Sequence, residues 1–186
     1  MAVVGYTLFD TAIGRCAIAW NPLGVVAVQL PEASPGQTIR RICEKSAAGA
    51  VFLPAPPAMQ RAVAAIVGLL QGSGESLAAI ALDQSSLSPF YRRIYAAARA
   101  IPPGQTLTYG ELARQCGAPA AARAVGQAMA RNPFPLIVPC HRVMAARPGG
   151  GGFSAHGGID TKARLLRLER AASQQAASGQ QQLPLR

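Results

Sequence analysis

The stretch that most restricts how this chain can fold is Pro139-Cys140-His141-Arg142-Val143. It follows an apolar, β-branched run at residues 136–138, which predicts a short buried strand. Pro139 has no backbone N–H to give to a strand ladder, so this strand should end there. Cys140 would then lie at the end of a rigid element, beside one of only two histidines in the chain. A neighbouring imidazole can activate a thiol as a nucleophile, although a buried structural cysteine is the commoner role for such a residue.

Positive charge is concentrated in the second half of the chain. Residues 1–87 contain five basic and five acidic side chains. Residues 88–170 contain eleven arginines and one lysine against three acidic residues, a net charge of +9. This asymmetry indicates a polyanionic partner for the second half. A general preference for arginine is the alternative, but it does not explain why the charges balance only in the first half.

The first half, residues 1–82, predicts a small α+β scaffold domain with an antiparallel sheet. Its expected elements are strands at 3–8, 16–20, 25–30 and 77–82 and helices over 34–48 and 58–70. Ser34 and Pro35 have the order of a helix cap followed by a first-turn proline. Cys16 and Cys43 should be buried apolar side chains, because no CxxC spacing and no histidine before residue 141 supports a zinc site.

Residues 83–87 form a polar connector, and residues 88–172 predict a mainly helical second domain. The expected helices cover 88–100, 109–116, 120–131 and 161–172, the last capped by Asp160. The second and third are joined by a turn with glycine and form a candidate helix-turn-helix of the winged-helix type. Thr108 and Glu111 have the spacing of a capping box. A glycine-rich loop is expected at 145–152 and a disordered tail at 173–186.

Location and redox state follow from what the sequence does not contain. No apolar run is long enough to cross a membrane, and the N-terminus has no signal-peptide pattern, so a cytoplasmic protein without membrane contact is expected. The four cysteines are scattered without a disulfide pattern, which favours reduced thiols.

Three motifs in order carry a family resemblance. Arg123-Ala124-Val125-Gly126, then Asn132-Pro133, then the pentapeptide at 139–143 resemble the O6-alkylguanine-DNA alkyltransferase family, also called methylated-DNA–protein-cysteine methyltransferases. The similarity is strong over 88–170 and much weaker over 1–82. It implies a DNA repair protein that flips O6-alkylguanine, chiefly O6-methylguanine, out of duplex DNA and transfers the alkyl group irreversibly to a cysteine, once per molecule. No metal and no organic cofactor is implied, and a monomer is expected.

The resemblance also assigns the reacting groups. It makes Cys140 the alkyl acceptor, His141 a base acting through water, and Glu169 the carboxylate that orients the histidine. Asp160 is an alternative to Glu169 but lies at the wrong motif position. Without the resemblance, Glu169 would be interpreted as a surface glutamate beside Arg170.

Other matched positions concern the nucleotide. Tyr109 corresponds to a tyrosine that contacts the phosphate side and donates toward the purine, although a core aromatic residue would fit the same position. The backbone of Val143 would read the guanine amine, and the backbone of Ser154 would donate to the guanine oxygen. Arg123 would take the place of the flipped nucleotide while its helix lies in the minor groove.

Two further matches are structural, and two positions depart from the family. Asn132 would fix the turn beside the active-site strand, and Arg142 is expected to be a buried structural cation. Many relatives have a tyrosine where this chain has Phe153, which cannot donate a hydrogen bond. The Ala155-His156 insertion lengthens the following loop, with His156 expected to face solvent. Both departures leave the alkyl size and any action on O4-alkylthymine open.

Two other classes of function account for part of the sequence. A lesion sensor of the alkyltransferase-like type would share the fold and flip the base but lack the acceptor cysteine, which Cys140 argues against. An unrelated cysteine hydrolase would not explain the helix-turn-helix pattern or the uneven charge.

Overall fold

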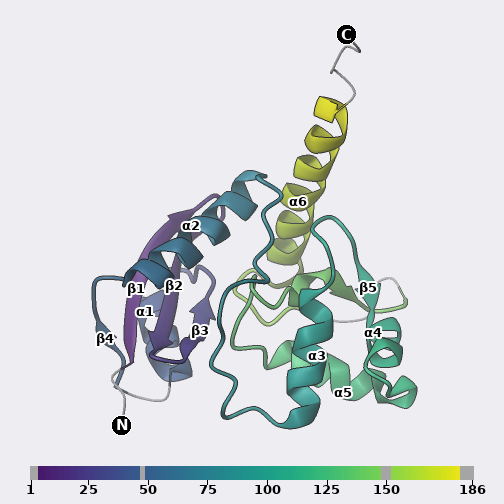
Figure 1. Cartoon of the computed structure of the whole chain (residues 1–186), viewed down its shortest axis with the longest axis horizontal. Helices are drawn as coiled ribbons and strands as arrows, with labels where there is room; N and C mark the ends of the chain where they lie inside the picture. The colour runs from purple at the N-terminus through teal and green to yellow at the C-terminus, as the bar shows by residue number, and fades with distance from the viewer. Residues whose placement is uncertain (1–3, 47–48, 148–151, 181–186) are drawn as a thin grey trace.

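The computed structural model describes the backbone of residues 4–46, 49–147 and 152–180, and side chains within these ranges up to residue 172. Figure 1 shows two parts side by side, with α6 rising beside both. The first part contains β1 (Gly5–Thr11), β2 (Gly14–Asn21), β3 (Gly24–Gln29), α1 (Pro35–Lys45), β4 (Val51–Phe52) and α2 (Pro57–Gln71). The second part contains α3 (Pro89–Arg99), β5 (Leu107–Thr108), α4 (Tyr109–Gln115), the 3-10 turn η1 (Pro119–Ala121), α5 (Ala122–Ala130), the 3-10 turn η2 (Cys140–Arg142), β6 (Val143–Met144) and α6 (Gly158–Gln180).

The sheet of the first part is mixed rather than purely antiparallel as predicted. Its order is β3-β2-β1-β4, and the three long strands form the expected antiparallel meander. The correction concerns β4, which pairs in parallel with β1. After α1 the chain returns to the β1 edge, where Val51 N and Leu53 N donate to carbonyls of β1 and the residue before it. A strand of two residues gives too weak a period to be found in the sequence.

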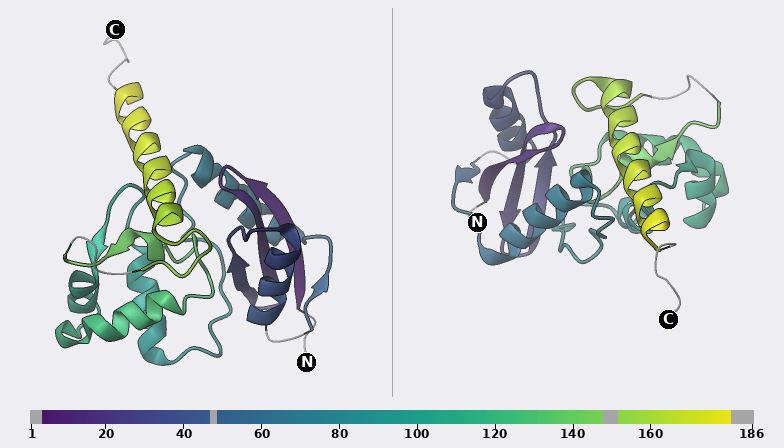
Figure 2. Two further views of the ribbon diagram at one scale, coloured as in Figure 1. Left: turned by 180° about the vertical axis from the view of Figure 1, so that it is seen from behind. Right: turned by 90° about the horizontal axis from the view of Figure 1, so that it is seen from above.

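Both faces of this sheet are covered. Cys16, Ile18 and Trp20 alternate along β2 with Ala17 and Ala19, as the two-residue period of a strand requires. The first set packs with α2 and with apolar residues of the second part in one continuous core. The alanines pack against Ile42 of α1 on the opposite face. Figure 2 shows α1 and α2 on the two sides of the sheet.

The long segment between α2 and α3 is held by backbone contacts rather than by the strand predicted at 77–82. Only a bridge between Val25 and Leu82 forms there within the described residues. Gly24 explains the close approach, because a Cβ built on it would lie 2.6 Å from the Ala81 carbonyl oxygen. Arg99 of α3 donates to three carbonyls of the same segment, at Leu77, Ala78 and Ile80.

The second part places α4 and α5 next to each other, connected through η1. The predicted capping box is present at the start of α4: the Thr108 hydroxyl accepts from Glu111 N, and the Glu111 carboxylate accepts from Thr108 N. Tyr95 of α3 is fully buried and donates its hydroxyl to the Ala128 carbonyl of α5 at 3.0 Å. This bond fixes α5 against α3.

The prediction of a strand at residues 136–138 is wrong. These residues are buried as expected, but they form a tight turn in which Leu136 has a φ of 73° and Pro135 bridges to Val138. The cause lies in the flanking residues. Prolines at 133, 135 and 139 remove ladder donors, and the Asn132 side chain spans the turn instead. It accepts from Phe134 N at 2.9 Å and donates to the Val138 carbonyl at 2.8 Å.

The last helix is longer than predicted. α6 begins at Gly158, so Asp160 lies in its first turn and does not cap it, and it continues to Gln180. The tail from residue 173, predicted as disordered, is therefore helical as far as residue 180, in keeping with the high helix propensity of alanine and glutamine. Residues 181–186 of the tail, residues 148–151 of the glycine-rich loop and Val3 of the first predicted strand lie outside the described residues. No described helix is both long and apolar enough to cross a membrane.

Removing the Tyr95 hydroxyl should loosen the contact between α3 and α5. We expect Tyr95→Phe to lower the free energy of unfolding by about 1–2 kcal/mol, because a buried acceptor loses a partner. Urea denaturation measures the change. Half-buried Tyr91, one turn earlier on the same helix, is the matched control, and Tyr91→Phe should cost less than about 0.5 kcal/mol. Equal effects of the two variants would contradict this role of the Tyr95 bond.

Candidate active site

Cys140 follows the Asn132-bound turn directly and begins η2. Its N–H donates to the Val138 carbonyl at 2.8 Å, which ties the cysteine backbone to the same turn. The residue is only 7% exposed. Asn132 therefore positions the cysteine indirectly, by fixing the segment immediately before it.

Behind Cys140 lies a buried cluster of three charged or ionisable side chains. Glu169 Oε1 is 2.8 Å from His141 Nε2 and 2.7 Å from Arg142 Nη2. Arg142 Nε also donates to Glu169 Oε2 at 2.9 Å, and Nη1 donates to the Ile101 carbonyl. Glu169 additionally accepts from Gly104 N at 3.2 Å. Arg142 is thus a buried structural cation, as the sequence predicts. The structure brings Glu169 rather than Asp160 to the histidine.

The cluster determines which nitrogen of His141 carries the proton. Burial alone raises the pKa of Glu169, but the bonds from His141 and Arg142 outweigh it and lower the pKa to about 2. The ionised carboxylate can only accept, so Nε2 of His141 must be the donor. Burial lowers the pKa of His141 more than Glu169 raises it, which favours the neutral imidazole. Nδ1 then keeps its lone pair, and it has no partner among the described residues.

The Cys140 thiol lies in surroundings that oppose its ionisation. Burial raises its pKa, while the Asn132 amide and the charges of Lys162 and Lys45 act in the opposite direction. Lys162 is 8% exposed and donates from Nζ to the Val143 carbonyl at 2.7 Å. At rest the group is therefore a thiol, and a base is needed to ionise it.

A cavity of 420 Å³ opens on Cys140 from the second part of the chain. Its lining residues are Tyr109, Gly126, Met129, Ala130, Cys140, Gly152, Phe153 and Ser154. It brings together Cys140, Tyr109 and Ser154 of the predicted site. Burial raises the pKa of Tyr109, so its hydroxyl stays protonated and can donate. The volume falls in the range of small-molecule sites, roughly 300–1,000 Å³.

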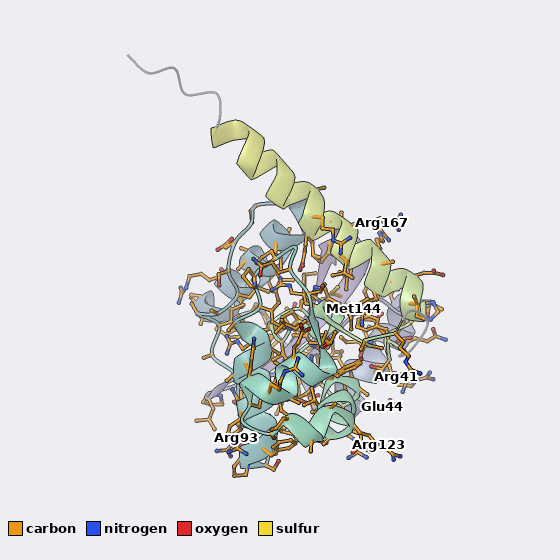
Figure 3. The ribbon with its side chains drawn as sticks, turned by 90° about the vertical axis from the view of Figure 1, so that its right-hand side faces the viewer. Arg41, Glu44, Arg93, Arg123, Met144 and Arg167 are labelled. Carbon is orange, nitrogen blue, oxygen red and sulfur yellow. The ribbon has the colours of Figure 1, made fainter. Side chains whose placement is uncertain are left out.

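The remaining predicted residues lie around this cavity rather than on it. Val143 is fully buried in β6, paired with Leu107 of β5, and its carbonyl already accepts from Lys162. Arg123 is exposed on the first turn of α5, and Figure 3 shows it projecting from the molecule. Asn132 lines a second cavity, which also reaches Cys140.

Sequence reasoning missed Lys162. One signal could have found it: it is the only lysine between residues 88 and 170, and it precedes Glu169 by seven residues. That spacing places both on one face of a helix, toward the same site.

Comparison with known proteins bears on this geometry. The sequence profile of the family described as 6-O-methylguanine DNA methyltransferase, DNA binding domain, matches residues 89–171. A methylated-DNA–protein-cysteine methyltransferase of Mycobacterium leprae is 41% identical over 161 residues, which cover 87% of this chain and 89% of that protein. The chain belongs to the methylated-DNA–protein-cysteine methyltransferase family. The resemblance carried by the three sequence motifs is thereby confirmed, and with it the DNA-repair methyltransferase class.

Other members of this methyltransferase family are also similar to the chain in sequence and in structure. The protein of that name from Mycolicibacterium paratuberculosis is 51% identical over 86 residues, a match that spans 46% of this chain and about half, 51%, of that protein. The crystal structure of Mycobacterium tuberculosis OGT in complex with DNA superposes with a TM-score of 0.70 at 33% identity and covers 90% of this chain and 94% of that one. The fold of the two parts is therefore that of solved family members.

The Glu169 carboxylate should make stability depend on acid pH. Its folded-state pKa lies below the ordinary 4.5, so its contribution is complete above pH 4.5 and is lost as the pH falls toward 2. We expect Glu169→Gln to lower the free energy of unfolding by about 3 kcal/mol at pH 7. Urea unfolding at pH 7, 4.5 and 3 measures the gap to wild type, which should narrow in acid.

Exposed Glu44, in α1, supplies the control for this pH series. Glu44→Gln should change stability by less than about 0.5 kcal/mol at each pH. A gap for Glu169→Gln that stays constant with pH would show that the ionised carboxylate is not what stabilises the cluster.

Proposed function

We propose that this protein repairs duplex DNA by transferring the alkyl group of O6-alkylguanine, with O6-methylguanine the expected substrate, to Cys140, once per molecule. The observation that carries the proposal is the position of Cys140: it lies on the wall of a base-sized cavity with Tyr109 and Ser154, directly in front of the His141–Glu169 pair. A cavity formed largely by apolar side chains and small residues suits an unstacked purine.

The chemistry follows from the protonation states. His141 Nδ1, with its free lone pair, takes the Cys140 proton through a water molecule, and Glu169 stabilises the imidazolium that results. The thiolate attacks the alkyl carbon; an S–C bond forms as the C–O bond breaks, and the electron pair stays on the guanine oxygen. Donors from Tyr109 and from the Ser154 backbone stabilise that leaving base. Because a neutral thioether does not readily release its thiolate, the alkyl group stays on Cys140 and the transfer ends with the alkylated protein.

Duplex DNA must reach this cavity with the target base turned out. α4 and α5, joined through η1, would act as a helix-turn-helix whose second helix enters the minor groove. Small residues on α5 allow close approach of the backbone, and Arg123 is its one long cation. Arg123 would fill the gap in the stack, the backbone of Val143 would read the guanine amine, and Asn132 would hold the turn before Cys140. The DNA complex of the Mycobacterium tuberculosis protein supports a DNA partner.

The two alternative functions, a lesion sensor and a cysteine hydrolase, are each opposed by one observation. The cysteine argues against a lesion sensor without transfer, and the family argues against a cysteine hydrolase. The monomeric state, the cytoplasmic location and the division into domains at residues 83–87 stay predictions.

Transfer should be stoichiometric and confined to Cys140. Incubation with an excess of a methylated-guanine oligonucleotide should add one methyl group to the intact mass, and peptide mapping should place it on Cys140. Cys140→Ser should show no mass gain while still binding the oligonucleotide. More than one equivalent of repaired base per protein, or an adduct on Cys16, Cys43 or Cys116, would overturn the proposal.

Arg123→Ala should slow repair of duplex DNA more than reaction with the free modified base. Unstacking a base costs a few kcal/mol unless the gap is filled, so a loss of about tenfold or more is expected on duplex DNA alone. Rates of methyl loss from the two substrates measure this difference.

The control for Arg123→Ala is Arg93→Ala. Arg93 is another exposed arginine, on α3, that projects toward a different side in Figure 3 and lies over the Phe90 ring. It should leave both rates within about twofold of wild type. Equal losses on duplex and free base in Arg123→Ala would mean that Arg123 supports the pocket instead.

A further inference from the structure

Cys140 borders a second cavity, of 390 Å³, that lies between the two parts of the chain. On one side are Cys140 and residues of α5 and the turn after it. On the other side are the end of β3 and α1, which contribute Gln29, Leu30, Glu32, Arg41 and Lys45. The first part, which the sequence alone presents as a scaffold, therefore forms a wall of the space around the reacting sulfur.

The chain uses lysine in only two places. Of its eighteen basic side chains, sixteen are arginines, and the two lysines are Lys45 and Lys162. Burial raises the pKa of the Cys140 thiol, and the charges of both lysines act to lower it, although the two come from helices far apart in the sequence. A lysine ammonium is a compact point charge, whereas the arginine guanidinium is a delocalised fork suited to carboxylates and phosphates. The two cations whose charges lower the pKa of the Cys140 thiol are thus both lysines.

Lys45 differs from the other cations of α1 in its contacts. Arg40 and Arg41 both lie within ion-pair distance of Glu44, at 3.9 and 3.5 Å. Lys45 is the last residue of α1, and its Nζ lies 3.5 Å from the Val28 carbonyl of β3, at the edge of the second cavity. Figure 3 shows Arg41 and Glu44 close to each other, on the outside of the molecule.

The charges that face this cavity are mixed, but cations predominate. α1 supplies Lys45 and Arg41, the end of α5 supplies Arg131, and Glu32 after β3 is the one acid on the wall. Glu32 is also near other partners: its carboxylate accepts from Gln29 and lies 3.9 Å from His156 Nδ1.

The other titratable groups near Cys140 belong to its own half of the chain. They are Lys162 on α6, Tyr109 on α4, Tyr95 on α3 and His141. Lys162 is already bound to the Val143 carbonyl, and His141 is bound to Glu169. Arg142 faces Glu169 and the Ile101 carbonyl. Lys45 is therefore the group through which the first part of the chain lowers the pKa of the Cys140 thiol.

We propose that Lys45 is a positioning residue for the transfer reaction: its ammonium stabilises the thiolate of Cys140 across the second cavity, so that the first part of the chain assists the chemistry. This inference rests on the proposed function for its meaning, because it concerns the nucleophile assigned there. The proton itself still leaves through His141. Lys45 only lowers the cost of the negative charge that remains on sulfur.

The test compares three variants of the full chain. Lys45→Met keeps the length of the side chain without its charge, Lys45→Arg keeps the charge, and Arg40→Met removes a cation of the same helix that does not line the cavity. The rate of Cys140 alkylation by iodoacetamide, followed by peptide mapping, is measured from pH 6 to 10. Transfer from free O6-methylguanine is measured at pH 7, because a free base excludes any contact between Lys45 and DNA.

We expect Lys45→Met to move the midpoint of the pH–rate profile upward by about 0.5–1 unit, since Lys45 is solvent-accessible and its effect is partly screened. Transfer from the free base should slow about threefold to tenfold. Lys45→Arg should recover most of the loss, and Arg40→Met should stay within about twofold of wild type. Added salt should reduce the difference between Lys45→Met and wild type.

An unchanged midpoint in Lys45→Met, in a variant with the thermal unfolding midpoint of wild type, would overturn the inference. A loss seen only on duplex DNA would also overturn it, because Lys45 would then be a DNA contact. Failure of the proposed function looks different. In that case wild type itself would not take the methyl group from guanine, while the iodoacetamide profiles of the variants would still separate.

Discussion

The buried Glu169 carboxylate connects parts of the chain that are far apart in sequence. It accepts from His141 and Arg142 in η2 and from Gly104 in the turn after α3, and it stands on α6. Such a group is costly to bury, and only several donors in good geometry offset the lost hydration. Because the donors come from two segments and the carboxylate from a third, the carboxylate is satisfied only when all three segments are in place. The orientation of the imidazole behind Cys140 is a consequence of that same arrangement.

The six helices and the first three strands could be predicted from the sequence, because cap residues, prolines and apolar periods are local signals. Ser34, Ser88 and Thr108 each cap the helix that follows them. The strands predicted at 77–82 and 136–138 did not form, because side chains bind the backbone groups there in place of a strand ladder. The turn at 133–139 depends on the two bonds of the Asn132 amide, and the segment at 77–82 depends on Arg99, which reaches it from another helix. No local period records such contacts.

The sequence predicted the reacting residues of the site but not the segments that surround them. Cys140, His141 and Glu169 come together as the family resemblance implied, whereas burial of Lys162 and the approach of α1 depend on packing between segments. Not all of the arginines in the second half of the chain are available to a polyanionic partner. Arg142 is buried against Glu169, and Arg99 binds carbonyls inside the fold. Part of the excess positive charge of the second half therefore serves the fold, and the rest is available to a polyanion.

One apolar core runs from the sheet of the first part into the helices of the second, with Ile18, Leu69, Tyr95 and Val138 among its fully or almost fully buried members. A boundary that is clear in composition is thus crossed by the main hydrophobic contact of the molecule. The two halves are expected to unfold together in a single cooperative transition, with one free energy of unfolding. A destabilising change in the small sheet would then be felt at the cysteine, although the two are far apart along the chain.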